Sequence, residues 1–313
     1  GRDTAVMLAA LCGAKTLLGS ATPSVESYFN AATGKYGLVT LAERYGGAVL
    51  PRVNVSDTLR AAKRGEKRSH FNKVLLDRIG EALQAGSQAI LFQNRRGFSP
   101  YVECGHCGWT ANCPDCNVSL TYHKSDGSLR CHYCGYRIPV PAVCPSCGTG
   151  SLLPRGFGTE KIEQELAAIF PEAAIDRLDA DTSQSAGGYR RIVEAFEQGR
   201  TDILIGTQIV TKGLDFGGVS LVGILNADNL LNYPDFRAGE RAFQLMTQVG
   251  GRAGRRSEPG TVVIQTAQPQ HPVIEQVLRG DYGAMVRSQL AERRAFFYPP
   301  YCRLIAVVMR HRD

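Results

Sequence analysis

Long apolar runs, internal repeats and low-complexity tracts are missing from this sequence. No apolar run reaches the roughly 18–20 residues that a membrane-spanning helix needs. No signal-peptide pattern opens the printed chain. For these residues, the absences exclude a helical membrane span and a repeat architecture.

The composition is that of a globular chain with a modest basic excess. The 313 residues are 43% hydrophobic and 21% charged, which predicts a buried core and about two domains of roughly 150 residues each. The formal net charge of +7 permits a nucleic-acid partner without requiring one. Because Arg2–Leu11 reads as the middle of a helix, we expect the chain to be a piece of a longer protein.

The ten cysteines carry the strongest signal. Cys12 and Cys302 lie far from the rest in apolar contexts and are predicted to be small core residues. The other eight form four Cys-x-x-Cys pairs within 44 residues: 104/107, 113/116, 131/134 and 144/147. The crowding of these cysteines in one segment argues against a disulfide scaffold. A thioredoxin-like redox motif would explain only one pair, and no pair is followed by the His of a haem attachment site. Two structural zinc sites of four cysteines each remain.

The residues between the pairs favour a nested arrangement of these sites. Each pair is followed by Gly or Asn, which suits a left-handed turn around the thiolates. Asp126-Gly127 predicts a hairpin that brings the second and third pairs together. The inner site is then Cys113, Cys116, Cys131 and Cys134, and the outer site is Cys104, Cys107, Cys144 and Cys147. A crossed arrangement, as in RING-type modules, would not use the hairpin. His106, His123 and His132 are predicted to be surface residues rather than ligands.

Outside the cysteine segment, apolar strands alternate with amphipathic helices, which predicts an α/β domain with a largely parallel sheet. The cysteine segment interrupts this alternation between a strand and a helix, so it is predicted to be an insertion. Residues 44–70 read as a connector with a basic run at 60–68. The predicted strands are 14–19, 89–92, 174–179, 202–205, 219–226 and 261–266, and the predicted helices are 72–84, 159–170, 189–198 and 238–249.

Three stretches carry candidate chemistry. Ser20 and Thr22 follow the first predicted strand, where hydroxyls either bridge to a neighbouring lobe or cap a helix. The loop after the strand at 202–205 offers hydroxyls, a lysine and backbone amides suited to phosphate, unless it is an ordinary polar loop. Gln248, Arg252 and Arg255 fall on one helical face beside glycines, which favours a γ-phosphate contact over a solvated basic face. The loop residues in question are Thr207, Gln208, Thr211, Lys212, Gly213 and Asp215.

In this order, the stretches GSATPS, ILFQNRRGF, TKGLDF and QVGGRAGR resemble motifs III to VI of superfamily 2 helicases. The paired-cysteine insertion and the stretch PDFRAGERAFQLMTQVGGRAGR are similar to the PriA family of bacterial replication-restart helicases. The resemblance implies a RecA-like lobe with an inserted zinc module and ATP-driven 3′-to-5′ DNA unwinding with Mg²⁺. It also implies recognition of stalled forks and primosome assembly. The implied partners are branched and single-stranded DNA, single-stranded DNA-binding protein and primosome proteins. The implied location is the bacterial cytoplasm at the nucleoid.

The resemblance also assigns roles to residues. Gly213 and Asp215 would face the nucleotide cleft, and Arg252 and Arg255, with Gln248, would sense the γ-phosphate. The residues implied to contact DNA or couple it to ATP are Ser20, Thr22, Gly158, Thr159, Thr207, Gln208 and Thr211. One departure is Gly250, where the family leads us to expect Ala, and which we expect to loosen its helix slightly.

Two motor motifs are missing: the Gly-x-x-x-x-Gly-Lys-[Ser/Thr] phosphate cradle and an Asp-Glu-x-His box. We therefore expect both to precede Gly1, and we expect this piece alone to hydrolyse no ATP. The expected domains are 1–45 (end of helicase lobe 1), 46–101 (linker and start of lobe 2), 102–153 (zinc insertion), 154–267 (rest of lobe 2) and 268–313 (start of a C-terminal domain). The alternative is a zinc-ribbon nucleic-acid-binding module without motor activity.

Zinc also changes the charge balance. Eight thiolates and two Zn²⁺ ions would take the formal charge from +7 to about +3, leaving each site locally at about −2. Any DNA contact by the insertion must therefore come from surrounding cations, for which Lys124, Arg130 and Arg137 are the predicted candidates.

Overall fold

The computed structural model describes residues 2–41, 51–93, 101–123, 126–155, 159–179, 182, 186–207, 216–254 and 259–305. The chain divides into two compact units, Gly1–Val39 and Thr40–Asp313. No helix among the described residues combines the length and apolarity that crossing a membrane requires.

The smaller unit contains two helices, α1 (Arg2–Leu11) and α2 (Val25–Ala32). The strand predicted at 14–19 is wrong: this stretch has no regular structure, and Leu17 is 97% exposed. A strand needs a hydrogen-bonded neighbour, and the described residues of this unit include no other strand. Cys12 is exposed, so its prediction as a core residue is also wrong.

The larger unit is built on a six-stranded sheet in the order β1-β13-β12-β4-β11-β10. Every neighbouring pair is parallel, which confirms the predicted α/β class. The strands are β1 (Arg52–Asp57), β4 (Gln88–Phe92), β10 (Ile175–Leu178), β11 (Ile203–Gly206), β12 (Val219–Ile224) and β13 (Thr261–Thr266). Parallel strands require crossover connections, and helices provide most of them here.

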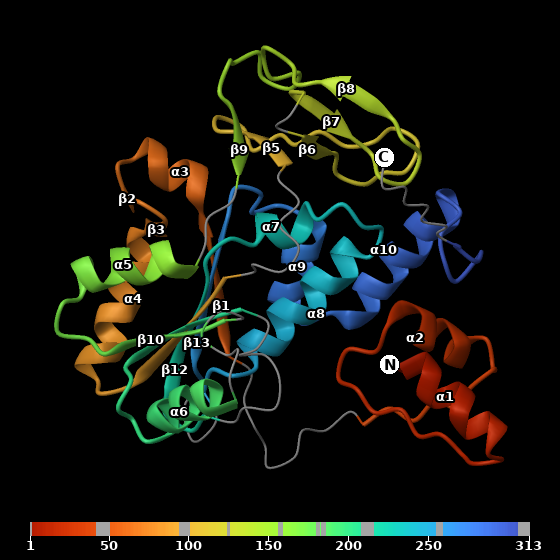
Figure 1. The fold of residues 1–313 in the computed structure, drawn as a ribbon, viewed down its shortest axis with the longest axis horizontal. Helices are drawn as coiled ribbons and strands as arrows, with labels where there is room; N and C mark the ends of the chain where they lie inside the picture. Colours follow the sequence, from red (N-terminus) through yellow and green to blue (C-terminus); the bar gives the residue numbers. More distant parts are fainter. Residues whose placement is uncertain are drawn as a thin grey trace, which may run out of the picture. The chain divides into compact units, whose positions relative to one another are not determined.

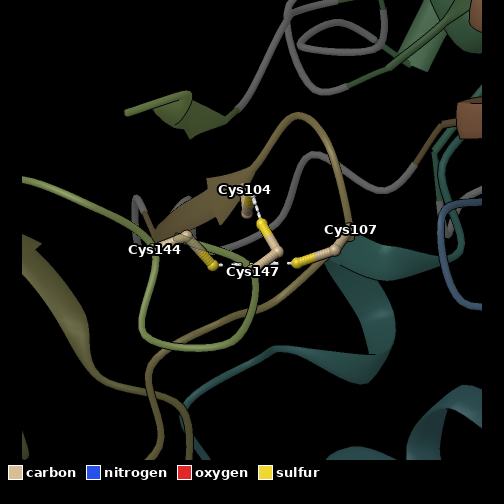
Figure 2. Close-up of side chains that lie close together, drawn as sticks. All are labelled: Cys104, Cys107, Cys144 and Cys147. Atoms are coloured by element: carbon tan, nitrogen blue, oxygen red, sulfur yellow. Dashed lines mark hydrogen bonds between the residues drawn. The ribbon is translucent and has the colours of Figure 1, made fainter. Parts of the chain in front are cut away.

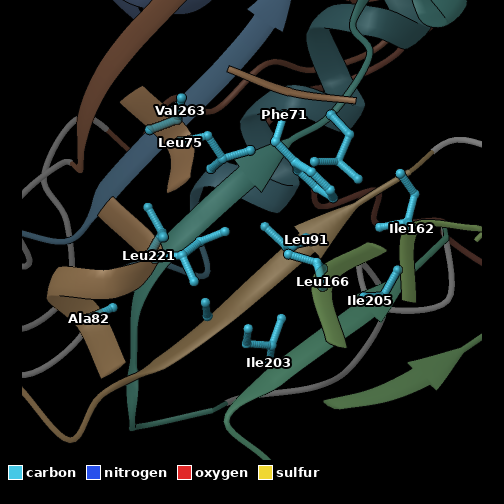
Figure 3. Close-up of a cluster of buried hydrophobic side chains, with 13 residues drawn as sticks. Phe71, Leu75, Ala82, Leu91, Ile162, Leu166, Ile203, Ile205, Leu221 and Val263 are labelled. Carbon is cyan, nitrogen blue, oxygen red and sulfur yellow. The ribbon is translucent and has the colours of Figure 1, made fainter. Parts of the chain in front are cut away.

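The connecting helices are α4 (Lys73–Gln84), α5 (Thr159–Ile169), α6 (Ala186–Glu197), α7 (Asp228–Leu231) and α8 (Ala238–Gly250). Four of the connecting helices match predicted segments closely, and the short α7 was not predicted. Helices α4 and α5 cover one face of the sheet, where their apolar residues form a buried core with β4, β11 and β12 (Figures 1 and 3). At Gly223 a Cβ would lie only 2.6 Å from Leu91 Cδ2, so glycine lets α4 and the sheet pack closely.

The connector predicted at 44–70 contains more structure than its composition indicates. Arg52–Asp57 forms the edge strand β1, paired in register with β13, and α3 (Thr58–Lys63) follows it. A short antiparallel pair, β2 (Lys67–Arg68) and β3 (Phe71–Asn72), leads into α4. An edge strand has one sheet neighbour and alternates polar and apolar residues, so its local sequence resembles a connector.

The cysteine-rich insertion leaves the lobe after β4 and returns before α5. Strands β5 (Tyr101–Cys104) and β9 (Leu152–Arg155) pair antiparallel where the insertion begins and ends. Between them, β6 (Thr121–His123), β7 (Ser128–Arg130) and β8 (Arg137–Pro139) form a three-stranded antiparallel sheet. Beyond β13, α9 (Pro272–Arg279) and α10 (Tyr282–Ala295) pack against α8.

Candidate metal centres and motor-lobe residues

The four Cys-x-x-Cys pairs fold into the same backbone turn. In each, the N–H of the first cysteine donates to the carbonyl of the residue five positions later, at 2.7–2.8 Å. The residue four positions later donates its N–H back to the carbonyl of that cysteine, at 2.8–3.1 Å. The residue four positions after the first cysteine has a positive φ in all four turns, which confirms the left-handed turn predicted from sequence. These residues are Gly108, Asn117, Gly135 and Gly148. We call each of these turns a knuckle.

The outer group of cysteines brings four sulfur atoms together (Figure 2). Cys104 Sγ lies 3.6 Å from Cys147 Sγ, and Cys107 Sγ lies 3.7 Å from Cys144 Sγ. These separations are too long for a disulfide, whose sulfurs lie about 2.05 Å apart. They match the roughly 3.8 Å edge of a tetrahedron with metal–sulfur bonds of about 2.3 Å. The donor set therefore fits a zinc ion.

The inner group of cysteines shows the same geometry. Cys113 Sγ lies 3.5 Å from Cys134 Sγ, and the ligand atoms of each four-cysteine group all lie within 4.8 Å of one another. The β6–β7 hairpin brings the two inner knuckles together. The two groups are nested as predicted, and the crossed arrangement is excluded.

Burial and hydrogen bonds act in opposite directions on the cysteine thiols. The first cysteine of every pair is buried. Burial raises the pKa of the Cys107 thiol to about 12, because a thiolate loses its hydration there. The Thr149 hydroxyl, 3.3 Å from Cys147 Sγ, is the main cause lowering the pKa of that thiol to about 5. With four sulfur ligands each, both sites leave no position for substrate, so bound zinc would stabilise the fold rather than perform chemistry.

The residues around the inner site include an unpredicted contact with α10 and the segment that follows it. Tyr298, which follows α10, donates its hydroxyl to the carbonyl of Cys116 at 2.8 Å. The Tyr298 ring stacks on Phe236, with centroids 4.5 Å apart, and Asn117 donates to Glu292 of α10. Tyr298 lies 182 positions from Cys116, and no local pattern signals a contact at that separation.

The basic residues predicted to offset the zinc charge are engaged within the insertion. Arg130 and Arg137 both form ion pairs with Asp126 in the hairpin. Lys124 lies outside the described residues. Of the three histidines, His106 and His132 are exposed as predicted, whereas His123 is half-buried with its ring 5.3 Å from that of His132. Cys302 is half-buried and donates to the Phe297 carbonyl, so it too is not a core residue.

Two residues predicted to contact or sense DNA are buried in the lobe. Thr159, at the start of α5, is fully buried and donates its hydroxyl to Asp179 at 2.5 Å. Thr207 directly follows β11 and is 4% exposed. Both side chains are buried in this conformation, and their direct contact with DNA stays a prediction. A role in coupling DNA to ATP, by fixing α5 and the loop after β11, stays a prediction.

The structure describes two of the three motif VI residues. Gln248 is exposed near the end of α8, and helical turns continue through Arg252 and Ala253 to a positive φ at Gly254. Arg252 is half-buried, and the loss of hydration lowers the pKa of its guanidinium. A Cβ at Gly260 would collide with the backbone of Ala253 and Gly254, so this glycine permits the close approach that holds the turn.

The remaining predicted site residues divide into two groups. In the smaller unit, the backbone N–H of Thr22 donates to the hydroxyl of Ser20, and the Thr22 side chain is buried. The others lie outside the described residues; they are Gly158, Gln208, Thr211, Lys212, Gly213, Asp215 and Arg255.

Comparison with known families finds two matches within the chain. Residues 113–139 match the Cys-rich region (CRR) domain of PriA DNA helicase, and residues 158–257 match the helicase conserved C-terminal domain. Replication restart protein PriA of Bacillus subtilis is 42% identical over 312 residues, 100% of this chain and 39% of the relative. The Haemophilus influenzae protein of that name is 40% identical over 314 residues, 100% of this chain and 42% of the relative.

The chain spans about two fifths of the length of these curated relatives. Among solved structures, RecG bound to a three-way DNA junction is 15% identical, with a TM-score of 0.48 over 88% of this chain and 27% of that one. Dbp5 of S. cerevisiae, bound to RNA and ADP BeF3, is 14% identical, with a TM-score of 0.46 over 88% of this chain and 54% of that one.

Proposed function

Because the chain belongs to the PriA family of replication restart proteins, we propose that it supplies the second motor lobe and the zinc module of an ATP-dependent DNA helicase. The helicase would move 3′-to-5′, recognise stalled replication forks and initiate primosome assembly. The observation that carries this proposal is one arrangement: two nested four-cysteine groups between β4 and α5 of a parallel lobe. Nothing in the sequence or the fold favours a zinc-ribbon module without a motor.

In this proposal, motif VI and the loop after β11 bind ATP with Mg²⁺. Gly213 and Asp215 face the nucleotide, while Arg252 and Arg255 stabilise the negative charge that develops on the γ-phosphate. The position of Arg252 supports its role, because a half-buried guanidinium on a tightly held turn is already partly dehydrated and oriented. Gln248, one turn earlier, would orient the nucleotide or a water molecule.

The DNA strand would cross the carboxyl edge of the sheet. Gln208, Thr211 and Gly158 would contact the phosphate backbone. The buried Thr159 and Thr207 would transmit the position of that strand to the nucleotide loops. Ser20 and Thr22, which follow α1 in the smaller unit, would contact DNA or couple its binding to ATP.

The zinc module would provide the surface on which single-stranded DNA-binding protein and primosome proteins assemble. Such partners would place the protein at the nucleoid in the cytoplasm. We propose the domain division expected from sequence, in which 1–45 ends the first lobe, 46–101 and 154–267 form the second, 102–153 is the zinc module and 268–313 opens a C-terminal domain.

The proposed function is tested by replacing Arg255 with Ala in a full-length family member that carries these residues. We expect DNA-stimulated ATP turnover to fall by about 10³-fold or more, the scale of a lost arginine finger, with unwinding abolished and DNA affinity retained. Arg279→Ala, on the exposed side of α9, is the matched control and should behave as wild type. Unwinding at a near-normal rate by the Arg255 variant would contradict the assignment.

A further inference from the structure

The helicase motifs do not account for a pocket at the carboxyl ends of β1 and β13. Helix α3, the first outer knuckle and the loop after β13 line an open pocket of ≈ 660 Å³. This volume lies within the roughly 300–1,000 Å³ typical of ligand sites. The residues that line it are mostly polar or basic, and they include Arg60, Lys63, His106, Gln268, Gln270 and His271.

The walls of this pocket are held by hydrogen bonds and close packing. Asp57 accepts from the N–H groups of Leu59 and Arg60, each at 2.9 Å, and so fixes the start of α3 at the end of β1. A Cβ at Gly108 would lie 3.1 Å from the Ala267 carbonyl oxygen and 3.5 Å from Leu59, so the outer knuckle packs against both other walls.

The buried side chain of Asp228 fixes the loop after β13 that lines the pocket. Asp228 accepts from the Thr266 hydroxyl at 2.7 Å and from the Ala267 N–H at 2.8 Å. It is 5% exposed, and these bonds fix the loop that begins at the end of β13. The pocket is therefore preorganised, which reduces the entropic cost of binding a ligand.

Two exposed cations line the pocket, and three more follow them along the chain. Arg60 and Lys63 are on α3, Arg64 is its C-cap, and Lys67 and Arg68 form β2; all five are exposed, as is Glu66 between them. Within the described part of the chain, no ion pair involves Arg60, Lys63, Arg64 or Arg68. On neighbouring α4, by contrast, Lys73 pairs with Asp77 and Arg78 pairs with Glu81. Cations left in mutual repulsion favour an anionic ligand.

A neutral hydrogen-bond donor completes the lining. The Nδ1 atom of His271 accepts from the Val273 N–H at 3.2 Å, so the ring proton lies on Nε2. Burial lowers the pKa of His271, which keeps the ring neutral near pH 7. His271 can therefore donate one hydrogen bond without adding charge, as can the side-chain amides of Gln268 and Gln270.

We propose that this pocket and the cations beside it bind the sugar–phosphate backbone of DNA at a second contact, with Arg60 and Lys63 on the phosphates. The cations continue past the pocket to Arg68, which suits a polymer of phosphates better than a single small anion. The contact lies across the sheet from Thr207, since β1 and β13 are on one side of β4 and β11 is on the other. It also supplies, from α3, the positive charge that the outer zinc site lacks.

The inference rests on the proposed DNA-binding function and is tested on the 313-residue chain itself. Fluorescein-labelled single-stranded and duplex DNA are titrated by anisotropy at several NaCl concentrations. The test variant is Arg60→Gln with Lys63→Gln. The control is Lys73→Gln with Arg78→Gln, which removes the same two residue types from a helix where both are paired. Loss of two phosphate contacts should reduce the slope of log K against log[NaCl] by about 1.4 on single strands or 1.8 on duplex.

We expect the test variant to bind DNA at least about tenfold more weakly in 0.1 M NaCl, and the control to bind as wild type does. The exchange variant Arg60→Lys with Lys63→Arg should restore most of the binding, and equal zinc content would show that all variants fold. If the test and control variants bind DNA with equal affinity and equal salt dependence, the proposed contact at the pocket is wrong, while the proposed function is unaffected. Loss of binding to a polyglutamate peptide but not to DNA would also overturn the proposed contact. No DNA binding by the unaltered chain would contradict both the pocket and the proposed function.

Discussion

Among single residues, Arg293 and Glu240 join α10 to α8 through a buried ion pair. Their closest atoms lie 2.6 Å apart, and the two side chains are 1% and 4% exposed. Arg293 also donates to the Pro299 carbonyl and lies 5.1 Å from the centre of the Phe236 ring. These contacts hold the turn that presents Tyr298 to the inner zinc knuckle. Because the pair is dehydrated, removing one partner leaves the other charge uncompensated.

Arg293→Met should therefore destabilise the chain by about 3–5 kcal/mol, the usual cost of breaking a buried pair. Adding Glu240→Leu should recover much of that loss, because the second charge is then also removed. Urea unfolding followed by circular dichroism gives both values, and Arg294→Met, on an exposed neighbour, is the control. A single variant as stable as wild type would show that the pair contributes little to the fold.

Gly250 is the last residue of α8, before the C-cap Gly251, and its flexibility costs helical stability. A Cβ there would meet Val262 Cγ2 at 3.4 Å, which is ordinary contact. Gly250→Ala should accordingly stabilise the chain by about 0.5–1 kcal/mol, the usual difference between Gly and Ala in a helix. Thermal unfolding measures the change. Gly223→Ala is the contrasting substitution, since its Cβ would meet Leu91 and Leu75 below 3 Å, and it should destabilise. A lower melting temperature for Gly250→Ala would contradict the packing argument.

Predictions for single residues succeeded where the structure is set by the spacing of residues close together in the sequence. The grouping of the eight cysteines followed from their pairs and from Asp126-Gly127, because knuckles and hairpins are short-range structures. The burial of Cys12 and Cys302 was misjudged, because exposure depends on distant elements. Thr159 lies beside Asp179 only once α5 and β10 are both in place. Tyr298 and Phe236 gave no local sign of their contact with the zinc module.

At the scale of elements, the parallel sheet followed from alternating strands and helices, since each buried strand reads as a continuous apolar run. Two strand assignments failed for opposite reasons. Residues 14–19 are apolar but have no strand to pair with in their unit, whereas Arg52–Asp57 is mixed in character yet pairs with β13. Pairing is a tertiary property, so edge positions are the hardest to predict from one sequence.

The fold of the four knuckles should depend on bound zinc more than the fold of the six-stranded sheet does. Chelation with EDTA should release two Zn²⁺ per chain, because each group offers four sulfur ligands. Hydrogen exchange should then accelerate in β6–β8 and around Tyr298, while β4, β11 and β12 stay protected. Release should become easier as pH falls, because protons compete for the thiolates. Cys302→Ser, outside both groups, is the control, and unchanged exchange in β6–β8 after chelation would contradict a structural role for the metal.

At the scale of the whole chain, the described residues form a parallel lobe with its cysteine-rich insertion and a small unit. A motor of this class binds ATP through a phosphate cradle that faces arginines across a cleft. The 313 residues contain the arginines of motif VI but no Gly-x-x-x-x-Gly-Lys-[Ser/Thr] stretch. The nearest approximation, Gly13-Ala14-Lys15-Thr16, lacks the second glycine, and it is exposed in an irregular segment rather than placed between a strand and a helix.

The chain alone should therefore hydrolyse no ATP above the rate of a buffer blank, with or without DNA, while still binding DNA through the second lobe. Phosphate release measured with malachite green, at ATP concentrations up to millimolar, checks the first part, and anisotropy checks the second. Gly13→Ala with Lys15→Ala should change neither result, because that segment does not form a cradle. ATP turnover that is stimulated by DNA and lost in the Lys15 variant would contradict this prediction. It would show that the segment binds phosphate and that the lobe obtains its nucleotide in a different way.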